Sequence, residues 1–363
     1  AMGSGALSSN TTAHNSVAIG RLALTTNTTG ASNVAIGCCA LKSNTTASNN
    51  VAVGKDSLKL NTTGADNTAV GTLSLDANTE GAGNTAVGCH ALGANTTANS
   101  NTAVGASALY SNTTGANNVA VGRTALENST TATANTALGF GSLRANTDGH
   151  SNTGAGQCAL NGNTTGDHNT AVGFLALDAN TTANNNTAVG SNALCTNIEG
   201  HCNTAVGFNA LLKNTVQRNT AVGAYAALCN TTGQQNVAIG YYTLDANTTG
   251  ACNVSIGGNL GNNTTGGGNI AIGNSALANN STCSDNVAVG RAAAQETNSA
   301  HGIVAIGALA LCKNTSGDNN TAVGFCTLEC NVSGASNVAL GVKALAANTT
   351  GGTNVAIGVT ALA

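Results

Sequence analysis

The hydrophobic and polar positions of this chain recur with a period of 17 residues. Each unit contains a short stretch that alternates by twos, as in residues 33–37 (NVAIG), where Val34 and Ile36 share one face and Ala35 the other. Such alternation predicts a short β-strand, and we expect the small Ala35 to face outward. A second apolar anchor, Leu41, stands four residues after the glycine and predicts a second short strand or a bend.

A glycine closes every one of these alternating stretches. The first five are Gly20, Gly37, Gly54, Gly71 and Gly88, and 21 glycines follow this register to Gly358, with two 16-residue steps that end at Gly223 and Gly273. A position without exception predicts either a positive φ or a backbone approach too close for a Cβ atom. The glycine of the Asn-Thr-Thr-Gly segment is instead replaced by alanine in three units, so that turn should not need a positive φ. The three are Ala47, Ala98 and Ala183.

A unit of 17 residues is too short for a helix pair, which takes more than about 30 residues. The abundance of Asn, Thr and Gly also disfavours helix. We therefore predict an all-β fold, a parallel β-solenoid of about 21 coils with a 17-residue repeat. We expect residues 6–363 to form one continuous repeat domain. Residues 1–5 are expected to be a cloning remnant, because an alanine precedes the only methionine.

An asparagine stands four residues before nearly every one of these glycines, for example at Asn33, Asn50 and Asn67. The position departs from asparagine only at Ser16 and Ile303. Asparagine side chains stacked at one strand spacing can bond to each other and to turn backbone. We predict such a ladder along the solenoid.

The composition narrows the possible partners. Charged residues make up 7% of the chain, its formal net charge is −3, and it contains 11 Lys+Arg, so it lacks the basic surface that binds nucleic acid or anionic membranes. No apolar run reaches the length of about 18 residues that spans a bilayer. With so few charges and a thin core of small side chains, we expect a further buried surface, which lateral association of several copies would supply.

The repeated stretch resembles the head repeat of trimeric autotransporter adhesins of the YadA type and related repeats of phage and viral tail fibres. Residues 15–20 read NSVAIG, and the motif returns at residues 33–37, 236–240 and 354–358. The resemblance covers residues 10–363. It implies a left-handed β-roll packed as a homotrimer at a bacterial or virion surface, which presents or spaces a binding surface for a host receptor or matrix. We also expect no enzymatic activity and no cofactor, because the carboxylates are spread thinly and a rod without loop insertions offers no pocket of the usual size.

The 12 cysteines scatter over different repeat positions, so we predict free thiols. Mostly reduced thiols would favour folding in a cytosol, as for a viral or phage fibre.

Four histidines share one loop position but lie three or more coils apart, so one chain gathers no metal site, although three copies of one histidine could meet at a trimer axis. The carboxylates are too dispersed for a catalytic pair. The histidines are His14, His150, His201 and His301.

Two further patterns leave alternatives open. Asn-Thr-Thr segments at Asn27, Asn44 and Asn61 fit the N-glycosylation pattern, but a turn also needs these residue types for its own hydrogen bonds.

Threonine replaces the first valine of the strand in six consecutive units, and an outward ladder of this kind would suit ice binding as the alternative function. An inward β-branched position would show the same residues. The six are Thr136, Thr153, Thr170, Thr187, Thr204 and Thr220.

Overall fold

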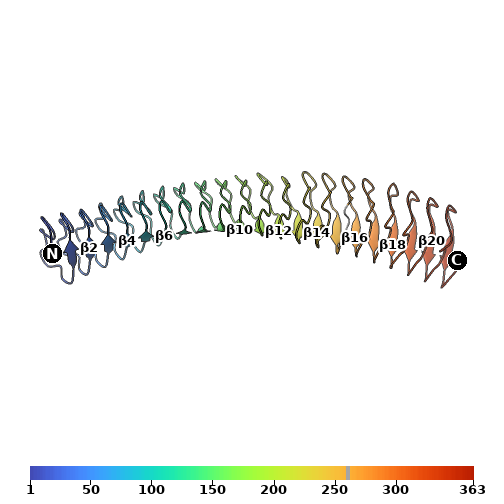
Figure 1. Ribbon diagram of the computed structural model, residues 1–363, viewed down its shortest axis with the longest axis horizontal. Helices are drawn as coiled ribbons and strands as arrows, with labels where there is room; N and C mark the ends of the chain where they lie inside the picture. The colour runs from blue at the N-terminus through green and yellow to red at the C-terminus, as the bar shows by residue number, and fades with distance from the viewer. Residues whose placement is uncertain (259–261) are drawn as a thin grey trace. The chain divides into compact units, whose positions relative to one another are not determined.

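The computed structural model describes residues 1–258 and 262–363, which form an all-β parallel β-solenoid with a 17-residue repeat. Two compact units divide the chain, Ala1–Asn185 and Asn186–Ala363. In each unit the backbone winds through successive coils that carry one strand apiece (Figure 1). The described residues contain no helix.

Every strand is three residues long and begins one repeat after the strand before it. The first unit contains β1 (Val17–Ile19), β2 (Val34–Ile36), β3 (Val51–Val53), β4 (Thr68–Val70), β5 (Thr85–Val87), β6 (Thr102–Val104), β7 (Val119–Val121), β8 (Thr136–Leu138), β9 (Thr153–Ala155) and β10 (Thr170–Val172). The second unit contains β11 (Thr187–Val189), β12 (Thr204–Val206), β13 (Thr220–Val222), β14 (Val237–Ile239), β15 (Val254–Ile256), β16 (Ile270–Ile272), β17 (Val287–Val289), β18 (Val304–Ile306), β19 (Thr321–Val323), β20 (Val338–Leu340) and β21 (Val355–Ile357).

Within each unit, consecutive strands pair in parallel and without any shift of register. Val34 lies beside Val51, and Ala35 lies beside Ala52. The 16-residue step keeps the same register, since Thr204 pairs with Thr220. Each position of the repeat therefore forms a column of equivalent side chains along its unit.

The expectation that Ala35 faces outward is wrong. Ala35 is 0% exposed, whereas Val34 is half-buried and Ile36 is 37% exposed. The space inside a coil explains the choice: at Gly154, which takes the place of alanine in this column, an added Cβ would lie 2.5 Å from Oγ of Ser142 and 3.1 Å from the carbonyl oxygen of Ala159. Alternation separates two faces, but the width of the coil decides that the small residue is the inner one.

The leucine column lies in a bend, not in a second strand. Leu41 is fully buried at φ 48°, and Cys39 two residues earlier has φ 59°. These left-handed conformations are costly for residues with a Cβ, so the surrounding packing must hold them. Buried leucine and alanine from successive coils together form the core of each unit.

The strand-closing glycines meet both conditions that the sequence predicted. They adopt φ between 118° and 142° along the solenoid. At Gly71 an added Cβ would lie 2.5 Å from the carbonyl oxygen of Gly88, in the next coil. Gly20, Gly37, Gly54 and Gly88 share this positive φ. No other residue type fits this corner without moving the neighbouring coil.

The predicted asparagine ladder is also confirmed. Oδ1 of Asn33 accepts the backbone N–H of Asn50 at 2.9 Å, and Oδ1 of Asn50 accepts that of Asn67 at 2.9 Å. Nδ2 of Asn50 donates to the carbonyl oxygen of Gly64 at 3.0 Å. Each side chain thus satisfies buried backbone groups of two turns.

A second ladder runs through the Asn-Thr-Thr segments. Nδ2 of Asn44 donates to Oδ1 of Asn27 at 2.8 Å, and Nδ2 of Asn61 donates to Oδ1 of Asn44 at 3.0 Å. All three side chains are fully buried. The folded protein therefore offers none of these three amide nitrogens for glycosylation, and the turn explains the pattern.

The first residues of the chain continue the same path. The N–H of Met2 donates to the carbonyl oxygen of Ala18 at 2.7 Å, and Gly3 has φ 128°, as the strand-closing glycines do. Met2 also forms an isolated parallel bridge with Ile19. Residues 1–5, expected to lie outside the repeat domain, thus extend the stack of coils.

Candidate interaction surface

The outward side chains of the strands form a continuous face along each unit. We call the first and third residues of every strand the outer strand face. In β2 these are Val34 and Ile36, and in β7 they are Val119 and Val121. Neither outward position in any of the 21 described strands holds a charged or amide side chain.

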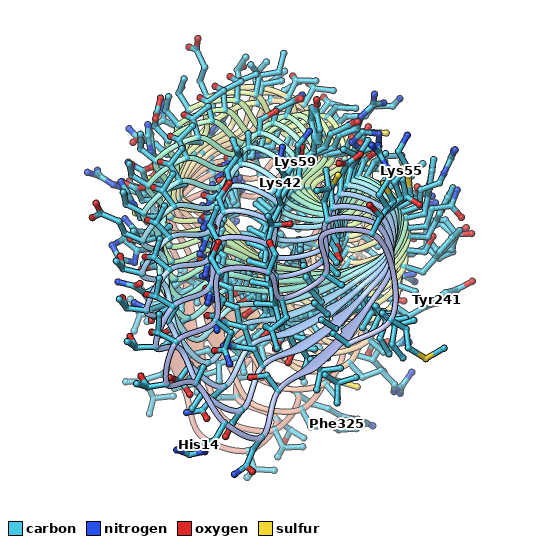
Figure 2. The ribbon with its side chains drawn as sticks, turned by 90° about the vertical axis from the view of Figure 1, so that its left-hand side faces the viewer. His14, Lys42, Lys55, Lys59, Tyr241 and Phe325 are labelled. Carbon is cyan, nitrogen blue, oxygen red and sulfur yellow. The ribbon has the colours of Figure 1, made fainter. Side chains whose placement is uncertain are left out.

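The outer strand face is uncharged and partly open to water, and its first position holds valine, isoleucine or threonine. Val87 is 36% exposed, Val121 39% and Ile306 40%. Charged side chains lie instead on the loops, and Figure 2 shows Lys42, Lys55 and Lys59 projecting outward from their coils. Because the outer strand face carries no charged side chain, it is a candidate surface for contact with another molecule.

The threonine ladder lies on this outer strand face, which answers whether that column points inward or outward. Thr136, Thr153 and Thr170 pair in register in the first unit, and each is half-buried. In the second unit Thr187, Thr204 and Thr220 do the same. The β-branched side chains therefore present hydroxyl and methyl groups to the outside, next to a column that holds Leu138, Ala155 and four valines.

All 12 cysteines are free, as the sequence predicted. The adjacent residues Cys38 and Cys39 bring their Sγ atoms to 3.6 Å from each other. Burial raises the pKa of the Cys283, Cys312 and Cys326 thiols. These thiols behave as small apolar side chains of the core and not as nucleophiles.

The dispersed titratable residues do not come together. Among residues 1–258 and 262–363, no group of three or more His, Cys, Asp or Glu side chains could hold a metal ion. His14, His150 and His301 are exposed in their loops. Asp76, Asp178 and Asp245 occupy one column several coils apart, and burial raises the pKa of each carboxyl group. Over the described ranges, these groups therefore form no metal-binding cluster within one chain.

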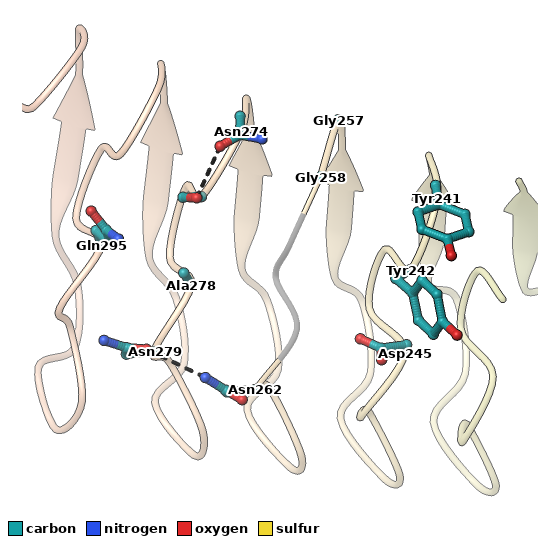
Figure 3. Close-up of a pocket in the computed structure, with 11 residues that line it drawn as sticks. Tyr241, Tyr242, Asp245, Gly257, Gly258, Asn262, Asn274, Ala278, Asn279 and Gln295 are labelled. Atoms are coloured by element: carbon teal, nitrogen blue, oxygen red, sulfur yellow. Dashed lines mark hydrogen bonds between the residues drawn. The ribbon is translucent and has the colours of Figure 1, made fainter. Parts of the chain in front are cut away.

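One local feature was missed by the sequence analysis. Four of the eight Phe and Tyr residues fall within residues 208–242 and contact one another. A hollow of about 950 Å³ opens beside them in the second unit, lined by Tyr241, Tyr242 and polar side chains (Figure 3). The clustering of aromatic residues in a chain with only 2% of them was the available signal.

No protein-family profile matches the sequence. No curated protein matches it either. The part of the chain that the structure describes has no helix of the length and hydrophobicity needed to cross a bilayer.

Proposed function

We propose that this chain is a structural and adhesive fibre segment. Three copies pack as left-handed β-rolls around a common axis through the outer strand face, and the assembly spaces or presents a receptor-binding surface on a bacterial adhesin or on a viral or phage fibre. The proposal includes no catalytic step and no cofactor. The observation that carries it is the uncharged, half-exposed outer strand face on all 21 strands.

Two physical arguments favour burial of this face. Parallel sheets in proteins are almost always covered on both sides, because their strands expose apolar side chains on each face. A monomer would leave this uncharged face, with its columns of aliphatic and threonine methyl groups, open along each unit. Monomeric proteins rarely expose more than a few hundred Å² of contiguous apolar surface. A partner molecule on the outer strand face would cover the open side of the sheet and remove its exposed surface from water.

A second copy of the same chain is the partner that fits best. Its outer strand face has the same spacing from coil to coil, so the side chains of two copies can interdigitate along their whole length. The resemblance to trimeric adhesin heads supports three copies. A loop surface rich in Asn and Thr then remains in contact with water.

The oligomeric state tests the proposal. Light scattering should give a mass near three times the 35.0 kDa of one chain. Val121→Lys should then lower the unfolding midpoint strongly, because it places a charge in the shared face, where the side chain is 39% exposed in one chain. Leu60→Lys is the matched control, since Leu60 is 47% exposed outside the strands. A monomer with two equally harmless substitutions would contradict the proposal.

Ice binding is the second candidate, favoured by the outward position of the threonine ladder. Thr136, Thr153 and Thr170 present hydroxyl groups at the regular spacing of the strands, about 4.8 Å. This function needs the outer strand face open to water, so it excludes a trimer buried through that face. Thermal hysteresis or ice shaping by a 35.0 kDa monomer would favour it over the fibre.

The compartment follows from the same proposal. A fibre acts outside the cell, on a bacterial or virion surface. Twelve free thiols indicate folding under reducing conditions, which suits a viral or phage fibre assembled in a cytosol better than an exported adhesin.

A further inference from the structure

Two adjacent cysteines bring their sulfurs together in the first unit. Cys38 and Cys39 follow the strand-closing Gly37, and their Sγ atoms lie 3.6 Å apart. Adjacent side chains of a strand would point to opposite faces. Here the chain has left the strand, and Cys39 adopts a left-handed φ of 59°. The bend after the strand therefore places two thiols on the same side of the chain.

The backbone of this pair is held by the coils on both sides. The N–H of Cys39 donates to the carbonyl oxygen of Arg21 at 2.9 Å, and the carbonyl oxygen of Cys38 accepts the N–H of Asp56 at 2.9 Å. The equivalent residues Leu22 and Asp56 share the left-handed conformation, with φ 60° and 57°. A ligand that bridges both sulfurs therefore finds them already close, which lowers the entropic cost of binding.

The surroundings of the pair leave one of its thiols open to solvent. Cys38 is half-buried, and Nη2 of Arg21 lies 3.9 Å from its Sγ. Burial and the hydrogen bond to Cys38 raise the pKa of the Cys39 thiol, so this thiol is protonated at neutral pH. In the adjacent coils Arg21 and Lys55 occupy the column of Cys38, and both are exposed. Because charged side chains need water, we expect this column to stay accessible in the proposed trimer.

The number and placement of the sulfurs select a class of ligand. Thiols bind soft, thiophilic centres. Zinc takes three or four protein ligands, but residues 1–258 and 262–363 contain no group of three His, Cys, Asp or Glu side chains that could hold a metal ion. Linear two-coordinate ions need their two sulfurs on opposite sides. Trivalent arsenic forms bonds at nearly right angles, and it needs only two sulfurs when its third position carries an organic group or a hydroxyl group.

We propose that Cys38 and Cys39 form a dithiol site for trivalent arsenic compounds. With phenylarsine oxide, two As–S bonds form while the bond from arsenic to the oxide oxygen breaks. The two thiol protons leave with that oxygen as one molecule of water, and neither arsenic nor sulfur changes its oxidation state. Arsenite would react in the same way, with the loss of two water molecules, and would keep one hydroxyl group. This inference does not depend on the proposed fibre function.

A second coil offers a matched control with a single thiol. Cys89 occupies the repeat position of Cys38 and is exposed, whereas His90 takes the position of Cys39 at φ 58°. The same bend thus carries one thiol in place of two. Cys89→Ser should leave arsenic binding unchanged, and His90→Cys should create a second site.

Mass spectrometry of the intact, native full chain tests the site. The protein would be kept reduced with a phosphine, treated with phenylarsine oxide and washed with an excess of the monothiol 2-mercaptoethanol. We expect one phenylarsenic group per chain, which 2,3-dimercaptopropanol removes because it offers two thiols of its own. Cys38→Ser and Cys39→Ser should each weaken binding at least about a hundredfold, since the second As–S bond forms within the same complex. His90→Cys should raise the number of bound groups to two.

Unfolding midpoints show which variants are folded. Cys38 is only half-buried, so Cys38→Ser keeps the test valid even if Cys39→Ser prevents folding. Arsenic binding that neither serine variant weakens would overturn the inference, as would complete removal of arsenic from the unsubstituted protein by 2-mercaptoethanol. A folded His90→Cys variant that binds one group only would also contradict it, because the shared bend is its basis.

Discussion

The carboxamide of Asn112 lies one coil before the hydroxyl of Ser129, and neither Oδ1 of Asn112 nor Oγ of Ser129 has a hydrogen-bond partner among the described residues. Elsewhere in this column an asparagine donates back to the coil before it, as Nδ2 of Asn112 does to Oδ1 of Asn95 at 2.9 Å. Serine is too short to continue the ladder. Both side chains are fully buried, so the interruption leaves polar atoms without compensation.

Restoring the ladder should stabilise the protein. Ser129→Asn would supply the donor that Oδ1 of Asn112 lacks, and we expect a gain of about 1–2 kcal/mol in the free energy of unfolding. The reverse change in an intact part of the ladder, Asn95→Ser, should lower it by a similar amount. Denaturant unfolding followed by circular dichroism, at one fixed protein concentration, measures both. Equal midpoints for all three proteins would show that the ladder contributes nothing.

Much of this architecture was predictable because equivalent positions of successive units can be compared within the one sequence. Asn50 and Gly71 were assigned their roles from recurrence, and the structure confirms both the ladder and the positive φ. The direction of Ala35 was predicted wrongly, since a period of two separates faces without telling which is enclosed. The hollow beside Tyr241 breaks the repeat, so no column comparison could reveal it.

The strand-closing glycines should tolerate no side chain. Gly71→Ala would place a Cβ 2.5 Å from the carbonyl oxygen of Gly88 at φ 138°, and we expect a loss of roughly 3 kcal/mol or more. Gly83→Ala is the comparison, because an added Cβ there would have no neighbour closer than Oγ of Ser100 at 3.9 Å, and Ala134 in the same column already adopts φ 58°. That change should stay within about 1 kcal/mol. Thermal unfolding of the two variants measures both losses of stability. A smaller loss for Gly71→Ala than for the comparison variant would refute the role assigned to the strand-closing glycines.

The half-buried carboxyl group of Asp178 should make the stability of the protein depend on pH. Burial raises its pKa above the ordinary value of 3.8, although a hydrogen bond from Asn161 acts in the opposite direction, and its Oδ1 has no partner among the described residues. The folded protein then holds this proton at pH values where the unfolded chain has lost it. Stability therefore falls as the pH rises through the raised pKa, and the full penalty is present near neutral pH.

Asp178→Asn removes this penalty. We expect the variant to unfold at a higher temperature than the unsubstituted protein at about pH 7. At about pH 3 the two should unfold at nearly the same temperature, because the Asp178 carboxyl of the unsubstituted protein is then largely protonated in both its folded and its unfolded state. Asp66→Asn serves as the control, because Asp66 is exposed and accepts a hydrogen bond from Nδ2 of Asn49 at 3.1 Å that an amide oxygen can also accept. A difference between Asp178→Asn and the unsubstituted protein that does not change with pH would contradict the argument.

The free thiols should separate into two classes by reactivity. Cys89, Cys202 and Cys252 are exposed, whereas Cys283 is 0% and Cys326 5% exposed, and burial raises the pKa of the latter two thiols. Since the thiolate is the nucleophile, both lower accessibility and a higher pKa slow alkylation. Iodoacetamide labelling of the native protein, followed by peptide mass spectrometry, should modify the three exposed residues first.

The same experiment tests the redox environment in which the chain folds. Complete labelling of all 12 cysteines after unfolding without reductant would confirm that none is lost to a disulfide, as their scatter over the coils requires. Cys38 and Cys39 are the most informative pair, because their sulfurs lie 3.6 Å apart and would be the first to oxidise together. If they resist labelling after unfolding until a reductant is added, the chain has passed through an oxidising compartment. Folding in a reducing cytosol would then no longer explain the cysteines, and an exported adhesin would become the better form of the proposal.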